Sequence, residues 1–167
     1  MVPASASALE AWWRLAPEVF RVLRDRLDAV AGFYTVCEID RVSHRLVEQD
    51  PVLARCWDHL RRYPVPRGQR VLFCRVWLSR DHGEAPSPVQ AASWLDLKRL
   101  YMEMRPTLRR IYTTVQDVAT YGPMVGPLGF EVLPGDPIDF DGVPYYAAQN
   151  DFGPSSIDGW LARLVAA

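Results

Sequence analysis

The segment that most limits how this chain folds is residues 70–79, RVLFCRVWLS. Apolar side chains occupy both its odd and its even positions, so a strand built from it has two apolar faces. Such a strand is stable only where other structure covers it on each side. The segment therefore predicts the central strand of a sheet with helices packed against both faces.

A well-marked helix start follows this strand after a polar loop. Ser87 is a favourable N-cap residue, Pro88 suits the first helical position, and Gln90 stands where a capping box has its glutamine. The helix is expected to end just before Pro106. Its buried stripe is spaced at three or four residues and consists of Trp94, Leu97, Tyr101 and Met104.

The rest of the chain alternates between helix-like and strand-like segments. Helices are expected at residues 8–15, at 51–63 after an Asp50 cap, at 118–128, and after Ser155, where Ile157, Trp160, Leu161 and Leu164 share one face. Strands are expected as a hairpin at 19–25 and 29–39, and at 108–116, 130–133 and 143–149. This order predicts an α/β or α+β domain with a mixed, mostly antiparallel central sheet flanked by helices.

Length and charge limit the class of protein. The 167 residues, 49% of them hydrophobic, predict one domain spanning 1–167. A formal net charge of −1 provides no field that attracts nucleic acid or an anionic membrane, and no apolar run is long enough to cross a bilayer. The N-terminus has no signal-peptide pattern, so we expect a cytoplasmic protein without nucleic-acid or membrane partners.

The cysteines and basic residues add two expectations. Cys37, Cys56 and Cys74 are odd in number and form no CxxC, which disfavours disulfides and zinc, and in the cytoplasm they would stay reduced. Cys56 and His59 share a predicted helix face, but no third residue completes an activated thiol, so a buried cysteine is the favoured interpretation. Lys98 is the only lysine among 19 basic residues, a bias that is typical of a GC-rich bacterium.

From residue 70 onward the order of elements resembles one known superfamily. The strand at 70–79 leads through a loop at 80–86 into the capped helix, and the strand at 108–116 is followed by a short helix that ends in Leu128-Gly129-Phe130. This order is similar to the acyl-CoA-binding half of the GNAT acetyltransferases, and Gly32-Phe33 resembles their earlier strands. The resemblance implies a GNAT-like acyl-CoA N-acyltransferase fold, acetyl-CoA or another acyl-CoA as donor, and a small-molecule or peptide amine as acceptor.

The resemblance also implies where CoA would bind. The pantetheine arm would bond to the backbone of Val76, Trp77 and Leu78, and the phosphates would lie near Arg80, His82, Gly83, Ser87, Val89 and Gln90. The family binds pyrophosphate with a glycine-rich loop at a helix N-terminus, where free N–H groups converge. Here the loop reads RDHGEAPS, in which Pro86 has no N–H, and Asp81 and Glu84 repel phosphate. We therefore expect weak CoA binding or none.

The catalytic residues of the family are also replaced. Its usual tyrosine would stand at Val125 and its usual asparagine at Val118. Tyr121 and Asp117 are the nearest substitutes, Tyr121 as the acid that protonates the leaving thiolate and Asp117 as an orienting group. The alternative for Tyr121 is a ring that packs the short helix with its hydroxyl in water.

These departures leave other functions open. One is a catalytically inactive GNAT-like sensory or protein-interaction module, excised from a larger protein, because the chain also lacks the family's first strand. Another is a pocket for a small ligand other than CoA. Residues 40–69 are expected on the substrate side, and their role as a lid is undecided. Trp12 and Trp13 cannot share one buried helix face, so one of them is a candidate contact with a second subunit, as in a homodimer, or with a neighbouring domain.

Overall fold

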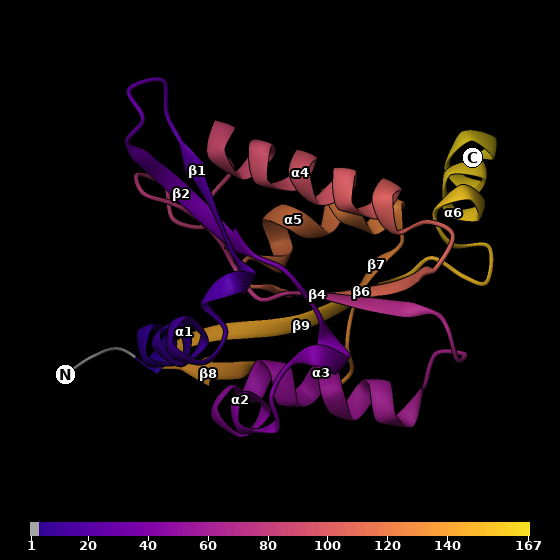
Figure 1. Ribbon diagram of the computed structural model, residues 1–167, viewed down its shortest axis with the longest axis horizontal. Helices are drawn as coiled ribbons and strands as arrows, with labels where there is room; N and C mark the ends of the chain where they lie inside the picture. The colour runs from indigo at the N-terminus through magenta and orange to yellow at the C-terminus, as the bar shows by residue number, and fades with distance from the viewer. Residues whose placement is uncertain (1–3) are drawn as a thin grey trace.

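The computed structural model describes residues 4–167 and contains a central sheet between two groups of helices (Figure 1). The helices are α1 (Ala4–Leu15), α2 (His44–Gln49), α3 (Pro51–Arg62), α4 (Pro88–Met104), α5 (Val118–Val125) and α6 (Ser156–Ala166), with short 3-10 turns η1 (Pro17–Val19), η2 (Ile39–Arg41) and η3 (Gly126–Leu128). The strands are β1 (Phe20–Arg24), β2 (Val30–Thr35), β3 (Cys37–Glu38), β4 (Arg70–Cys74), β5 (Trp77–Ser79), β6 (Leu108–Val115), β7 (Phe130–Val132), β8 (Ile138–Phe140) and β9 (Val143–Asp151).

The main sheet is mixed and mostly antiparallel, as expected. Its strand order is β3-β4-β6-β9-β7, in which β4 and β6 run parallel and the other neighbours run antiparallel. A smaller sheet has the order β1-β2-β5, and β8 forms a hairpin with β9. The predicted hairpin at 19–39 is confirmed, but its end turns away as β3 and joins β4 in the main sheet.

Only the first half of the predicted strand at 70–79 lies inside the main sheet, and the strand is not continuous. It breaks at Arg75 and Val76, so that β4 stays beside β6 while β5 turns away and pairs with β2. Arg75 is 2% exposed, and its Nε lies 2.5 Å from Oδ2 of the fully buried Asp50. This ion pair lies on the α1–α3 side of the sheet, and Trp12 Nε1 donates to the same Asp50 oxygen at 2.7 Å. The break therefore follows from long-range packing that local strand propensity does not contain.

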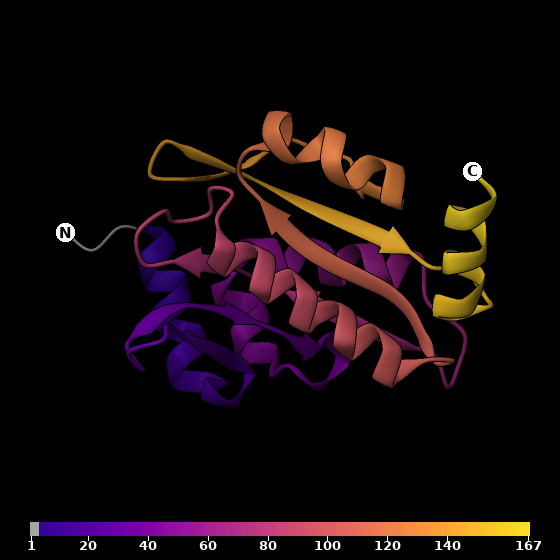
Figure 2. The same ribbon diagram turned by 90° about the horizontal axis from the view of Figure 1, so that it is seen from above.

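Helices cover both faces of the main sheet. The α1, α2 and α3 helices pack on one face, and α4 and α5 lie on the other, with α6 at the far end (Figure 1). Seen from above, α4 and α5 run on either side of β6 and β9 (Figure 2). Residues 40–69 thus form no lid over the α4–α5 side, because α2 and α3 pack beneath the sheet. No helix among residues 4–167 is long and apolar enough to span a bilayer.

Most predicted helix caps are present. Asp50 accepts from the backbone N–H of Val52 at 3.0 Å, and Ser87 accepts from that of Gln90 at 3.1 Å. Two details are wrong: among the described residues the Gln90 side chain accepts no hydrogen bond from the Ser87 N–H, so no capping box closes, and Ser155 makes no side-chain cap bond. Sequence reasoning also missed α2 and β8, which are too short to show a periodicity.

Two large apolar side chains, Leu161 and Trp13, are exposed. Leu161 is 37% exposed, whereas its neighbours Ile157 and Trp160 are buried, so the buried stripe of α6 is narrower than expected. Trp12 is fully buried and Trp13 is 59% exposed, with its ring 5.1 Å from that of Phe20. The contact of Trp13 with a second subunit or domain stays a prediction.

Candidate functional site

A groove opens where the two parallel strands separate. The β4–β6 pairing runs from Arg70 opposite Leu108 to Cys74 opposite Thr113, and it ends there because β5 turns toward β2. The two strands therefore diverge beyond Cys74. Beyond Thr113, β6 continues along β9 with its other edge open toward the gap.

The backbone of Trp77 faces this groove. On either side of Trp77, backbone hydrogen bonds join this segment to β2: Val76 O accepts from Thr35 N at 3.0 Å, and Arg80 N donates to Ala31 O at 2.8 Å. Hydrogen-bonded pairs alternate along an antiparallel ladder, so the N–H and C=O of Trp77 point away from β2. They are the backbone groups best placed to bond to a ligand in the groove.

The loop between β5 and α4 is closed on itself. Ser79 and Gly83 exchange two backbone hydrogen bonds of 2.8 and 2.9 Å, and Ala85 N donates to His82 O at 3.0 Å. The exposed Arg80 side chain pairs with Asp81 and donates to a β2 carbonyl. Few amides of this loop remain for a phosphate. A phosphate contact through Arg80, His82, Gly83, Ser87, Val89 and Gln90 stays a prediction.

Glu84 turns inward from this loop, a feature that sequence reasoning missed. Its carboxyl lies near the backbone N–H of Gln116, and its Oε2 is buried without a hydrogen-bond partner among residues 4–167. Burial raises the pKa of Glu84 from 4.5 to about 7, and the nearby positive charge of Arg75 opposes this rise. A carboxyl of this kind exchanges a proton near neutral pH.

Tyr121 lies beside Glu84. Its ring packs edge-on against Trp77, with centroids 5.9 Å apart, and its hydroxyl donates to the backbone carbonyl of Glu84. The hydroxyl is thus bonded to protein, contrary to the alternative that placed it in water, and burial raises the pKa of Tyr121. Tyr121 is close enough to the groove for the predicted acid role, which stays a prediction.

Asp117 occupies a different place. It is the N-cap of α5, where its carboxylate accepts from the N–H of Thr120 at 2.9 Å and from the Thr120 hydroxyl at 2.5 Å. These bonds lower the pKa of Asp117. The structure thus explains Asp117 as a cap that begins the helix carrying Tyr121, and a catalytic role for it stays a prediction.

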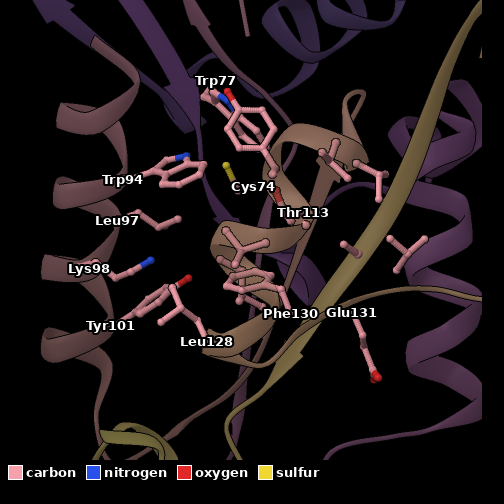
Figure 3. A pocket seen from close by; sticks show the side chains of 18 residues that line it. Cys74, Trp77, Trp94, Leu97, Lys98, Tyr101, Thr113, Leu128, Phe130 and Glu131 are labelled. Atoms are coloured by element: carbon pink, nitrogen blue, oxygen red, sulfur yellow. The ribbon is translucent and has the colours of Figure 1, made fainter. Parts of the chain in front are cut away.

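An apolar cavity of about 140 Å³ lies beneath the groove, between α4, α5 and the sheet (Figure 3). Trp77, Trp94, Leu97 and Tyr101 form one side, and Ile111, Val115, Leu128 and Phe130 are among the residues of the other side. Lys98 points its ammonium into this space, whereas Glu131 points away from it (Figure 3) and accepts a hydrogen bond from Gln149.

The Leu128-Gly129-Phe130 junction closes the far end of the cavity. Gly129 has φ +98°, and a Cβ there would lie 2.9 Å from Asn150 Oδ1, so both conformation and space favour glycine. The carbonyl of Leu128 accepts from Asn150 Nδ2 at 3.0 Å and from Trp160 Nε1 at 2.7 Å. The tripeptide is a helix end held by two side chains.

The Cys56–His59 pair forms no activated thiol. Cys56 is fully buried and burial raises its pKa, while His59 Nδ1 lies 2.8 Å from the Tyr112 hydroxyl. Cys37, Cys56 and Cys74 are free cysteines. Residues 4–167 contain no group of three His, Cys, Asp or Glu side chains placed to share a metal ion.

Comparison with known proteins places the fold. No protein-family model matches this sequence, and neither does any curated protein. Among solved structures, the C-terminal condensation domain of Ebony, in complex with beta-alanyl-dopamine, matches with a TM-score of 0.54 and 14% identity over 89% of this chain and 80% of that one. The CoA-dependent acyl-homoserine lactone synthase MesI matches with a TM-score of 0.51 and 13% identity over 92% of this chain and 72% of that one. The AHL synthase LasI matches with a TM-score of 0.51 and 8% identity over 86% of this chain and 68% of that one.

At such low identity these similarities establish the fold. The chain has a GNAT-like fold, as the order of its elements predicts.

Proposed function

We propose that the protein is an acyltransferase that moves an acyl group from a CoA thioester to a primary amine. One observation carries this proposal: where β5 and β6 separate, the Trp77 backbone is left without a strand partner on the β6 side, next to an apolar cavity that Trp77 and Tyr121 line, and beside Glu84. The fold neighbours support the donor class, since MesI is CoA-dependent. The complex of the Ebony domain with beta-alanyl-dopamine supports an amine-derived product.

The proposed chemistry uses two side chains. The amine nitrogen attacks the thioester carbonyl carbon, the C–N bond forms, the C–S bond breaks, and the thiolate leaves. Glu84 takes the proton that the attacking nitrogen loses, and Tyr121 gives its hydroxyl proton to the thiolate. The amide and the thiol then depart, Glu84 releases its proton to solvent, and Tyr121 takes one back. Asp117 contributes by capping the helix that holds Tyr121.

The closed loop shapes what binds. Because Ser79 and Gly83 already bond to each other, the diphosphate of CoA finds few free amides, and most of the affinity would come from the pantetheine arm and acyl chain. We expect weak binding of acetyl-CoA and tighter binding of donors whose acyl chain reaches the cavity.

A transfer assay tests this function. The protein is mixed with acetyl-CoA or hexanoyl-CoA and a panel of primary amines, thiol release is followed with a thiol reagent, and amides are identified by mass spectrometry. We expect both signals, a loss of at least a hundredfold in kcat for Glu84→Gln, and little change for the control Asp58→Asn, whose carboxylate is exposed on α3. Absence of amide with every donor and amine would contradict the proposal.

The closed loop favours a second candidate, a ligand-binding module without transfer. In that case the cavity would bind its ligand while no thiol is released from any thioester. The same assay, run beside a binding measurement, separates the two functions.

A further inference from the structure

Two polar side chains line the cavity, and an acyl chain would offer neither of them a hydrogen-bond acceptor. Of the cavity-lining residues that the structure describes, Lys98 alone points a charged group into the space, toward Leu128 and Phe130 (Figure 3). No carboxylate among residues 4–167 forms an ion pair with Lys98, and its Nζ lies 4.7 Å from the centroid of the Tyr101 ring. Burial lowers the pKa of Lys98, because it disfavours the charged ammonium.

Tyr101 supplies a second donor, its hydroxyl. It is 1% exposed, and its hydroxyl has no hydrogen-bond partner among the residues that the structure describes. Buried polar groups are bonded in most proteins, and an unpaired one costs free energy. The hydroxyl points into the cavity on the same side as Lys98 (Figure 3). Both groups can donate to a ligand, so the missing partner is an acceptor.

We propose that the cavity binds an apolar carboxylate, with its carboxylate on Lys98 and Tyr101 and its hydrocarbon part against the aromatic and aliphatic wall. A volume of about 140 Å³ fits a group of roughly the size of benzene. The ligand is either a free acid or the far end of a carboxyacyl group carried by a thioester. The second source rests on the proposed function, whereas the first is independent of it.

The first experiment needs no variant. Calorimetric titration compares benzoate with benzyl alcohol, and hexanoate with hexan-1-ol, on the whole chain. Each acid should bind at least about tenfold more tightly than its alcohol, because a hydrogen bond to a charged group is worth more than 1.4 kcal/mol. Equal affinity of acid and alcohol, or no binding of either acid at millimolar concentration, overturns the proposal.

The second experiment removes the donors. Lys98→Met keeps an unbranched side chain of similar shape without charge, and Tyr101→Phe keeps the ring. Each should weaken benzoate binding about tenfold and leave benzyl alcohol binding unchanged. The control Arg99→Met removes an exposed cation from the next position of α4 and should leave benzoate binding unchanged. Unchanged benzoate affinity in both cavity variants overturns the proposal, whatever the control does.

Thermal unfolding of each variant shows whether it is folded, so that weaker benzoate binding is not mistaken for a loss of folded protein. Tyr101→Phe should be at least as stable as the parent, since the hydroxyl it lacks is unpaired.

A third comparison separates the two sources. Adipyl-CoA, whose acyl chain ends in a carboxylate, is titrated beside hexanoyl-CoA. Tighter, Lys98-dependent binding of adipyl-CoA identifies a carboxyacyl donor, while Lys98-dependent binding of free acids alone identifies a separate ligand. If acids bind and no thioester reacts, the proposed function fails and this inference stands.

Discussion

At the scale of single residues, Glu84 makes the stability of the folded chain depend on pH. Its folded pKa of about 7 lies above the ordinary value of 4.5 because burial disfavours the charged form. Between these two pH values the folded chain keeps a proton that the unfolded chain has lost. The free energy of unfolding therefore falls as pH rises through this window, by at most about 3 kcal/mol, and this contribution is constant above and below it.

Glu84→Gln removes that dependence. The amide stays neutral at every pH, so we expect a smaller fall in unfolding free energy between pH 4.5 and 8 than in the parent. Urea unfolding across this range measures it, with Asp58→Asn as a control for loss of an exposed carboxylate. Identical pH profiles for the parent and Glu84→Gln would show that Glu84 is not buried as described.

At the scale of elements, the close approach of β2, β5 and α4 depends on Gly32. A Cβ at this position would overlap the carbonyl oxygen of Leu78 and come within 2.6 Å of a Val89 methyl carbon. Glycine thus allows β2 to pair with β5, and that pairing draws β5 away from β6 and opens the groove. With a larger residue at position 32, β2 could not pair with β5, and β5 would not turn away from the main sheet.

Gly32→Ala should therefore destabilise the protein by about 1–3 kcal/mol, the usual cost of overpacking. Gly122→Ala is the matched control, because a Cβ there meets only a Val118 methyl at 3.9 Å within α5. It should be neutral or stabilising by up to about 1 kcal/mol, since alanine favours the helix. Chemical unfolding compares the two variants, and equal stabilities would argue against the tight packing of β2 on α4.

At the scale of the whole molecule, the sheet separates two hydrophobic cores, and the cavity lies in the one on the α4–α5 side. The core beneath it contains Leu53 of α3, which is fully buried, and the core above it contains Leu97 of α4, which lines the cavity. A change in the lower core should affect stability without reaching the ligand. Packing is rigid enough that each core responds largely on its own.

Leu53→Ala should lower the unfolding free energy by about 2–5 kcal/mol and leave the affinity for benzoate unchanged. Leu97→Ala should also destabilise, but it enlarges the cavity and should shift its preference toward bulkier acids. Urea unfolding and calorimetry on both variants measure this. A benzoate affinity that changes as much in Leu53→Ala as in Leu97→Ala would show that the two cores are coupled.

Part of the candidate site was visible in the sequence. Tyr121 and Trp77 were both singled out from the sequence, and their rings pack against each other in the structure, while their roles stay predictions. Lys98 was noticed only as the single lysine, although it follows Trp94 by four residues and precedes Tyr101 by three, which places it on the buried stripe. Glu84 had no such signal, because a loop residue has no periodicity that indicates which way it points.

The sequence by itself determined the order of the elements, the caps at Asp50 and Ser87, the place of residues 70–74 inside the main sheet and the helix end at Gly129. These depend on side-chain periodicity and on backbone preferences within a few residues. Only the tertiary structure decided that the strand breaks at Arg75, that Tyr121 meets Glu84, and that a cavity remains. The partners in these contacts are 25 and 37 residues apart, so their energies arise only once the chain is packed.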